Sequence, residues 1–258
     1  MKSLISSLLL VTYLFACGTK DDTPEEPTGD SDALVCMNKV TCIDPLILDL
    51  NLQTEKADGL ITNTVDGGIW HTTVDATAGG AFAATPDSFV YAAFVDGGLL
   101  KVNYGDEEAL ESNRWDIAFR RFIIRLNSGV SGPGCTVATK LPAATDFANV
   151  VETPATAAFA AEAFFTAEPQ CDLIDDGFDI GSPATVLSGY FQYALGNPGC
   201  VQMTGSVYIV RTLSGRHVKL EVTHFYNDTA QATCQSDPAD FSTMGAGAAN
   251  IQLRWAFL

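Results

Sequence analysis

The stretch Asn113–Gly134, NRWDIAFRRFIIRLNSGVSGPG, decides the fold that the sequence predicts. It opens with a Trp-Asp pair, continues through Ile, Phe and Arg residues, and ends in a loop rich in Gly and Ser. Large apolar residues occupy both alternating faces, which is typical of a strand buried on both sides. They are Trp115, Ile117, Phe119 and Ile123 on one face and Phe122, Ile124 and Leu126 on the other. We therefore expect a central strand with a buried Trp115.

Asp116 is the acidic residue of this strand and lies among Arg114, Arg120, Arg121 and Arg125 in the sequence. An ion pair or backbone donors would give its carboxylate a structural role, and a catalytic role is the alternative. The chain contains no H-E-x-x-H, no G-x-S-x-G and no P-loop. We expect the structural role for Asp116 and no enzymatic activity for the chain.

Composition narrows the class of partner. The chain has 258 residues, of which 47% are hydrophobic and 17% charged, enough for one large core with or without an extension. Its formal charge of −17 comes from 14 basic and 31 acidic residues. Nucleic acids and anionic membrane surfaces attract basic proteins, so neither is expected as a partner.

The first 17 residues are expected to be a lipoprotein signal. Lys2 provides a positive start, and Leu4–Phe15 is apolar but too short to span a membrane. Leu14-Phe15-Ala16-Cys17 resembles the lipobox of bacterial lipoproteins, which implies cleavage before Cys17 and its acylation. Acyl chains anchor a protein without a spanning helix. We expect an outer-membrane anchor, facing the periplasm or the cell surface; an ordinary signal peptide is the alternative.

The remaining chain is divided into three further segments. Residues 18–33, GTKDDTPEEPTGDSDA, are acidic, rich in Pro, Thr and Gly, and without large apolar side chains, so we expect a disordered tether. Its Lys20-Asp21-Asp22 resembles an export signal of surface lipoproteins. Residues 34–68 are expected to be an extension, and residues 69–258 the main domain.

Six of the seven cysteines follow this signal: Cys36, Cys42, Cys135, Cys171, Cys200 and Cys234. An even number behind a secretion signal indicates disulfides. Cys36 and Cys42 enclose the shortest loop and are expected to form one pair. The hairpin about Ser214-Gly215 brings Cys200 near Cys234, which leaves Cys135 with Cys171, although other connectivities stay open. No Cys/His spacing suits zinc.

Alternating patterns predict an all-β, mostly antiparallel single domain with one short helix. The Gly-containing turns Asp96-Gly97-Gly98 and Ser214-Gly215 predict two hairpins. The expected strands include Leu46–Leu52, Phe89–Phe94, Leu99–Asn103, Tyr190–Leu195, Gly205–Leu213, Arg216–Phe225 and Ile251–Phe257. The Ala-rich segment Ala155–Phe165 is the expected helix, because prolines stand near its start and beyond its end.

Several of these features occur together, in order, in a known family. They are Thr73-Val74-Asp75-Ala76, the hairpin from Phe89-Val90-Tyr91 to Val102, Trp115-Asp116-Ile117-Ala118-Phe119 with Arg125, Asn127, Gly129 and Gly132 after it, and the last hairpin with Lys219 and the closing aromatic strand. Over about Ile69–Leu258 the chain resembles the HmuY-like haem-binding lipoproteins.

The resemblance implies a haem held between loops by two axial His or Met side chains and passed to an outer-membrane receptor. One ligand position corresponds to Leu195 here, and the other falls in Glu168–Asp176, which contains neither His nor Met. Met203 is the nearest soft donor and our candidate haem ligand; the alternative is that it packs beside Val201. We expect binding of haem or a related tetrapyrrole, and a haem-free surface binding or adhesion module is the second possibility.

The three histidines are expected to be structural or exposed. His71 lies at the edge of the family-like region, His217 beside a turn, and His224 on the apolar face of its strand. His217 and His224 are seven residues apart on one strand and therefore face opposite ways unless a bulge intervenes. Without such a bulge these two histidines cannot bind the same metal ion, and whether the chain binds a metal stays open.

Overall fold

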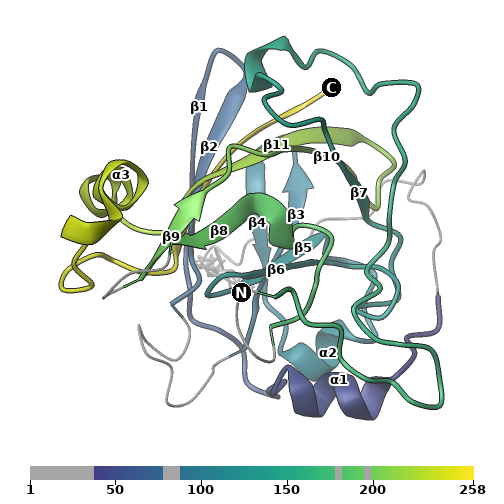
Figure 1. Ribbon diagram of the computed structural model, residues 1–258. Helices are drawn as coiled ribbons and strands as arrows, with labels where there is room; N and C mark the ends of the chain where they lie inside the picture. The colour runs from purple at the N-terminus through teal and green to yellow at the C-terminus, as the bar shows by residue number, and fades with distance from the viewer. Residues whose placement is uncertain (1–37, 78–87, 178–181, 195–198) are drawn as a thin grey trace, which may run out of the picture.

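The computed structural model describes residues 38–77, 88–177, 182–194 and 199–258 (Figure 1). The proposed signal, the tether, Cys17, Cys36 and Leu195 lie outside these residues. The described strands form three sheets in which all neighbouring strands are antiparallel. The all-β prediction is therefore confirmed.

The largest sheet has six strands in the order β1-β2-β12-β11-β10-β7. These strands are β1 (Ile61–Asp66), β2 (Ile69–Asp75), β7 (Val137–Lys140), β10 (Val207–Arg211), β11 (His217–His224) and β12 (Asn250–Phe257). The hairpin predicted about Ser214-Gly215 is present as β10 and β11, and the predicted closing strand is β12. A β-bulge separates Val222 from His224 in β11.

The second sheet has the order β4-β3-β5-β6 and is buried on both faces. Its strands are β3 (Val90–Val95), β4 (Gly98–Val102), β5 (Ile117–Arg120) and β6 (Ile123–Leu126). One face packs on the six-stranded sheet, where Phe94 lies against Trp255. The helices α1 (Ile43–Asp49) and α2 (Asp106–Ala109) lie at the lower end of the opposite face (Figure 1).

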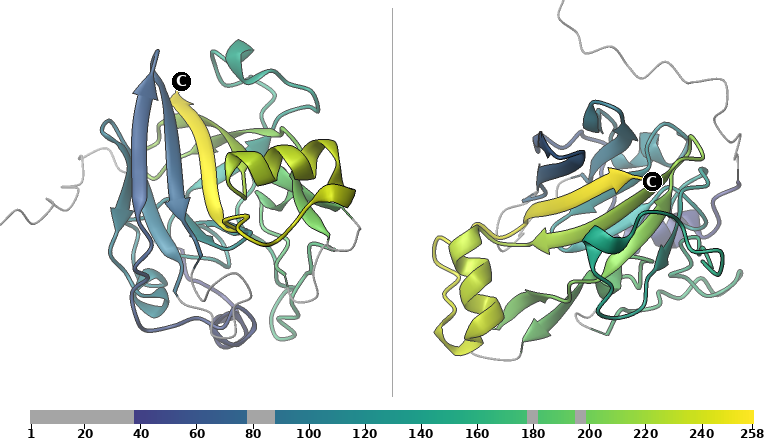
Figure 2. Two further views of the ribbon diagram at one scale, coloured as in Figure 1. Left: turned by 90° about the vertical axis from the view of Figure 1, so that its left-hand side faces the viewer. Right: turned by 90° about the horizontal axis from the view of Figure 1, so that it is seen from above.

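The remaining elements lie at the periphery. The third sheet is the hairpin of β8 (Phe191–Ala194) and β9 (Cys200–Met203), and helix α3 (Asp228–Ser236) lies beside β9 at one end of the molecule (Figure 2). Short 3-10 helices are η1 (Phe147–Asn149), η2 (Ser188–Tyr190) and η3 (Pro238–Asp240). No helix in the described part of the chain is long and apolar enough to cross a membrane.

The prediction of a single central strand is wrong, because the segment forms a hairpin of two strands. β5 and β6 are joined by a two-residue turn at Arg121 and Phe122, with Arg120 paired to Ile123. Arg121 has a φ of 53°, and its N–H donates to the carbonyl of Ala76. The usual sequence signal for such a turn is Gly or Asn, which this turn lacks. The prediction of burial on both faces is confirmed.

The buried Trp115-Asp116 pair behaves as predicted. Trp115 is fully buried, donates its indole N–H to the carbonyl of Ala109 at 2.9 Å, and meets the Tyr91 ring edge-on at 4.9 Å. The Asp116 carboxylate accepts hydrogen bonds from backbone N–H groups of Phe94 and Leu213. Its role is therefore structural.

Asp116 also connects the two large sheets. Phe94 belongs to β3, Leu213 to the turn between β10 and β11, and the Thr136 hydroxyl, a third donor at 3.0 Å, precedes β7. Burial raises the pKa of Asp116, although its three hydrogen bonds act in the opposite direction. One carboxylate thus holds three segments that are distant in sequence.

Asn63 makes a second connection between the sheets. Its side-chain amide donates to the carbonyl of Leu99 at 3.1 Å and accepts from the N–H of Leu99 at 3.0 Å. Leu99 lies on β4, at the edge of the four-stranded sheet, so the amide fills the place of a neighbouring strand. The Thr72 hydroxyl orients it by donating to the same amide oxygen at 2.7 Å.

Two secondary-structure predictions are wrong. Leu46–Leu52 is not a strand, because Leu46 and Leu50, four residues apart, are buried while Leu48 is 75% exposed; this is the periodicity of helix α1. Ala155–Phe165 is not a helix. Ala160 pairs with Ala138 of β7 through two backbone hydrogen bonds, so the segment is extended along the edge of the sheet.

The disulfides are Cys42–Cys171 and Cys200–Cys234. The second was predicted and is present. The predicted Cys36–Cys42 and Cys135–Cys171 pairs are wrong, because Cys42 joins Cys171 across a sequence separation of 129 residues. Cys135 is also disulfide-bonded. A short loop is easy to close in the unfolded chain, but the folded extension places Cys42 beside the segment that contains Cys171.

Replacing Trp115 with Ala should lower the free energy of unfolding by about 3–5 kcal/mol, the range for deleting a large core aromatic. Urea unfolding monitored by circular dichroism measures this change. Leu48→Ala is the control and should change stability by less than about 0.5 kcal/mol, because Leu48 is exposed. A loss below about 1 kcal/mol for Trp115→Ala would contradict the central role of this residue.

Candidate functional site

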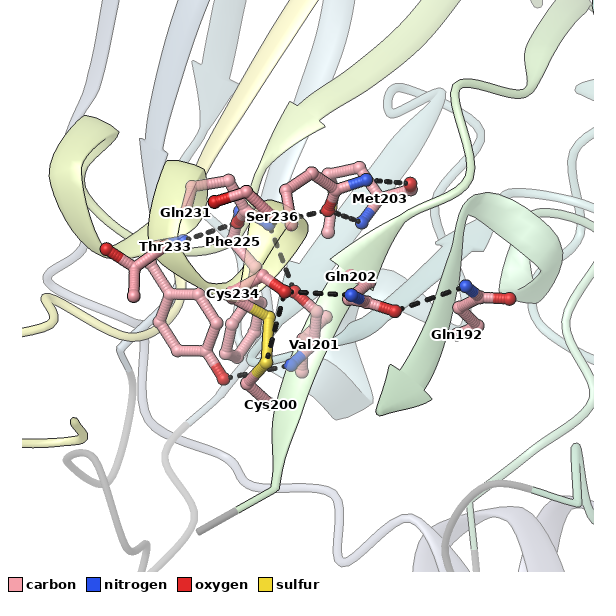
Figure 3. Close-up of a disulfide and its surroundings, with 12 residues drawn as sticks. Gln192, Cys200, Val201, Gln202, Met203, Phe225, Gln231, Thr233, Cys234 and Ser236 are labelled. Atoms are coloured by element: carbon pink, nitrogen blue, oxygen red, sulfur yellow. Dashed lines mark hydrogen bonds between the residues drawn. A yellow bond between two sulfur atoms is a disulfide. The ribbon is translucent and has the colours of Figure 1, made fainter. Parts of the chain in front are cut away.

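The region that the resemblance assigns to ligand binding is built on the hairpin β8–β9. The two strands pair from Phe191 opposite Met203 to Ala194 opposite Cys200. Helix α3 lies on the side of β9 opposite to β8, as Figure 3 shows. It begins at Asn227, whose side-chain oxygen accepts from the N–H of Ala230 at 2.9 Å and caps the helix.

Two glutamines of α3 hold the free edge of β9. Gln231 donates to the carbonyl of Val201 at 3.1 Å. Gln235 accepts from the N–H of Met203 at 2.9 Å and donates to its carbonyl at 2.8 Å. The hydroxyl of Tyr226 accepts from the N–H of Val201 at 3.1 Å. Residues four apart share a helix face, so Gln231 and Gln235 together replace a neighbouring strand.

The Cys200–Cys234 disulfide links the same two elements covalently. Both cysteines are fully buried, and their Cα atoms are 6.0 Å apart. Gln202 adds a hydrogen bond from its amide to the carbonyl of Cys234 at 2.8 Å. The disulfide and the glutamine hydrogen bonds thus join β9 to α3 (Figure 3).

Met203 is part of the main hydrophobic core and is only 8% exposed. Both of its backbone polar groups are occupied by Gln235. The alternative interpretation, in which Met203 packs beside Val201, describes its surroundings in this structure. Its role as a haem ligand stays a prediction.

The segment Glu168–Asp176 is fixed by covalent and backbone contacts. Cys171 is linked to Cys42 of the N-terminal extension, and Phe165 pairs with Leu173 in an isolated bridge. The chain at Cys42 is therefore fastened to the segment that the resemblance assigns to one axial ligand. Because this segment contains neither His nor Met, the two regions together do not fit a haem held by a pair of such ligands.

The histidines are dispersed. His71 is exposed on β2, and His217 is half-buried, with Nδ1 2.6 Å from the Thr153 hydroxyl. Burial lowers the pKa of His217. His224 is half-buried, and its Nε2 lies 3.9 Å from a carboxylate oxygen of Asp228. Within the described ranges, no three His, Cys, Asp or Glu residues gather in a way that would hold a metal ion.

Two surface clefts were not predicted from the sequence. One, of about 690 Å³, lies between the start of α3 and the chain that leads to β12. Its lining includes Asp228, Asp240 and Phe241, and the 90% exposed Met244 lies at its rim. In the sequence, Asn227 as a helix N-cap could have indicated α3, and with it one wall of this cleft. The second, of about 460 Å³, borders the Cys42–Cys171 disulfide.

Glu162 supports the segment that leads into β8. Its carboxylate is buried and accepts from the N–H of Leu126 on β6 and from the N–H of Val186, each at 2.9 Å. Burial raises the pKa of Glu162 to about 7, and the two hydrogen bonds limit the rise. Glu162 thus joins the edge of the four-stranded sheet to the residues before η2 and β8.

The described chain combines an antiparallel β core, a disulfide-linked hairpin and helix, and an N-terminal segment that the Cys42–Cys171 disulfide fastens to the body. The family model for the HmuY protein matches residues 85–237, and the chain belongs to the HmuY family. The family is one of binding proteins. The resemblance found in the sequence is therefore confirmed.

Three solved structures are similar in fold. A lipoprotein-named protein of Bacteroides fragilis NCTC 9343 is 15% identical, with 74% of this chain and 91% of that chain covered and a TM-score of 0.47. A protein of Bacteroides vulgatus ATCC 8482, named as a HmuY-like haem-binding protein, is 16% identical, with 73% and 91% covered and a TM-score of 0.44. The apo HmuY analogue of Tannerella forsythia is 17% identical, with 78% and 98% covered and a TM-score of 0.42. No curated protein matches the sequence.

Stability should decrease with rising pH because of Glu162. Its pKa is about 7 in the folded protein and 4.5 as the ordinary value, so between these values the folded state holds a proton that the unfolded state has lost. This contribution is fully present below about pH 4.5 and is lost as the pH rises through about 7, a total on the order of 3 kcal/mol. The measurement is urea unfolding from pH 4.5 to 8 for the wild type and Glu162→Gln.

Subtracting the free energy of unfolding of Glu162→Gln from that of the wild type removes the contributions of the other titrating groups. This difference should decrease as the pH rises. Glu152→Gln, at an exposed carboxylate nearby in sequence, should show no such trend. A Glu162 difference that is constant across this pH range would rule out the raised pKa.

Proposed function

We propose that this protein is a surface lipoprotein that binds haem or a related tetrapyrrole for uptake through an outer-membrane receptor. The observation that carries the proposal is membership of the HmuY family across residues 85–237. That range includes the four-stranded sheet, the β8–β9 hairpin and α3, which are the elements around the candidate site. The B. vulgatus relative, named as a HmuY-like haem-binding protein, is in keeping with it.

The attachment to the outer membrane is proposed from Cys17 alone. The Leu14-Phe15-Ala16-Cys17 sequence follows a short apolar segment, and an acidic stretch separates it from the first described residues. Acylation of Cys17 would keep the protein at the membrane, while the net charge of −17 keeps its body from anionic lipid surfaces.

Substitution of Cys17 should abolish lipidation. Wild type and Cys17→Ala are expressed with a labelled fatty acid, and label should appear in the wild type only. Cys17→Ala should also leave the membrane fraction. Equal label in both proteins would contradict the anchor without bearing on haem.

Met203 is the proposed iron ligand. It is the last residue of β9 and one of two methionines in the described part of the chain, the other being Met244. A thioether is a soft ligand and favours ferrous over ferric iron, so haem should bind more tightly under reducing conditions. The low exposure of Met203 requires its side chain to turn out of the core on binding.

Met203→Leu keeps the apolar packing and removes the sulfur. In a titration with reduced haem followed by absorbance, it should weaken binding by at least about tenfold and change the spectrum. Met244→Leu is the matched control and should bind as the wild type does. An unchanged spectrum and affinity for Met203→Leu would remove Met203 from the proposal.

A haem-free binding module is the second candidate function. The absence of His and Met from Glu168–Asp176 and the burial of Met203 favour it. Titration with iron-free protoporphyrin IX distinguishes the possibilities. Binding of both porphyrins by the wild type would indicate recognition of the macrocycle without iron ligation, and binding of neither would favour the haem-free module.

A further inference from the structure

The guanidinium group of Arg211 is without a polar partner in the described chain. Arg211 is the last residue of β10 and is half-buried, and its Nε is enclosed and makes no hydrogen bond. Its Cζ lies 5.6 Å from the centroid of the Phe159 ring, and no hydrogen bond or ion pair joins its side chain to any described residue. Arg125 also has an enclosed Nε, but Ser131 and Tyr91 bind its other two nitrogens. An enclosed donor and an unpaired charge are costly, so Arg211 calls for a ligand that supplies acceptors.

His217 lies beside Arg211 on the adjacent strand. The two residues are directly opposite each other in the β10–β11 ladder, so their side chains project from the same face of the sheet. The rings of His217 and Phe159 are 5.3 Å apart between centroids and inclined by 33°. Nδ1 of His217 lies 2.6 Å from the Thr153 hydroxyl, which leaves Nε2 for a further partner. A guanidinium and an imidazole thus flank one aromatic ring.

No acidic side chain of the described residues compensates these two basic groups. Burial and the charge of Arg211 lower the pKa of His217, and no carboxylate opposes them. Glu152, in the segment that approaches His217, is exposed and forms no ion pair with either group. Lys219 of the same sheet face directs its ammonium group to two backbone carbonyls. In a chain with a net charge of −17, this is a local positive region with unused donors.

We propose that Arg211 and His217 form a binding site for an oxyanion, the carboxylate or phosphate group of a small ligand. A guanidinium offers two parallel donors to either group, and its charge strengthens both hydrogen bonds. Nε2 of His217 provides a third donor when it carries a proton. Phe159 lies against both side chains and offers an apolar surface to the ligand. The site is built on β10 and β11, so it is additional to the β8–β9 region around Met203.

Inorganic phosphate and acetate are the probes for this site. The imidazole signals of the full chain in nonionic detergent are followed by NMR at about pH 6, and His217→Gln identifies those of His217. Sodium chloride holds the ionic strength constant, so that screening does not change during the titration. At least one probe should bind with a dissociation constant on the order of 1 mM. The bound anion should raise the pKa of His217 by about one pH unit, because it favours the protonated ring.

Substitutions of Arg211 separate charge from geometry. Arg211→Gln loses both and should weaken binding by at least about tenfold. Arg211→Lys keeps the charge without the planar fork, so its affinity should lie between those of the wild type and Arg211→Gln. Arg216→Gln is the matched control. It removes an exposed guanidinium of the same hairpin that is already paired with Asp96, and it should bind as the wild type does.

The two probes also identify the ligand class. Binding of phosphate alone assigns the site to phosphorylated ligands, binding of acetate alone to carboxylates, and binding of both to either oxyanion. A His217 signal and pKa that do not change with either probe up to about 50 mM, many times the expected dissociation constant, would overturn the proposal. So would equal binding by the wild type, Arg211→Gln and Arg216→Gln. The wild-type titration and Arg211→Lys decide the matter even where Arg211→Gln fails to fold.

Discussion

The buried carboxylate of Asp116 is the constraint on which the rest of the structure depends. Removing a carboxylate from water is costly unless hydrogen bonds replace its hydration. Asp116 obtains these bonds from β3, from the turn between β10 and β11, and from the residue before β7. The carboxylate is therefore satisfied only when both large sheets are in place, which couples their assembly. Trp115 packs beside it and anchors α2 through the carbonyl of Ala109.

The same solution recurs at the sheet edges, where polar side chains take the place of missing strands. The amide of Asn63, the carboxylate of Glu162 and the amides of Gln231 and Gln235 each bind backbone groups that a neighbouring strand would otherwise bind. An uncovered strand edge invites association with other chains, and covering it with a side chain prevents this without a longer sheet. Because side chains cover these edges, the short strands can remain in separate sheets.

Local patterns predicted much of the fold, and long-range contacts account for the rest. Turns that contain Gly predicted the β3–β4 and β10–β11 hairpins. The turn at Arg121 contains no Gly, and the sequence did not predict it. The Ala-rich segment near Ala160 has helical composition, but pairing with β7 outweighs that preference. For the site, the sequence predicted the Cys200–Cys234 pair, which is present, and proposed Met203, whose role as a ligand stays a prediction. It gave no sign of the glutamine contacts, because these join residues about thirty positions apart.

The Cys42–Cys171 disulfide has a mechanical consequence. Any force applied through the N-terminal end of the chain reaches Cys42 before it reaches α1. The sulfur bridge diverts that load into Cys171 and the body of the protein, so α1 is not peeled from the face it covers. In a protein held by its N-terminal end in flowing liquid, the covalent disulfide would thus bear the tension. The hydrogen bonds of the first helix would carry little of it.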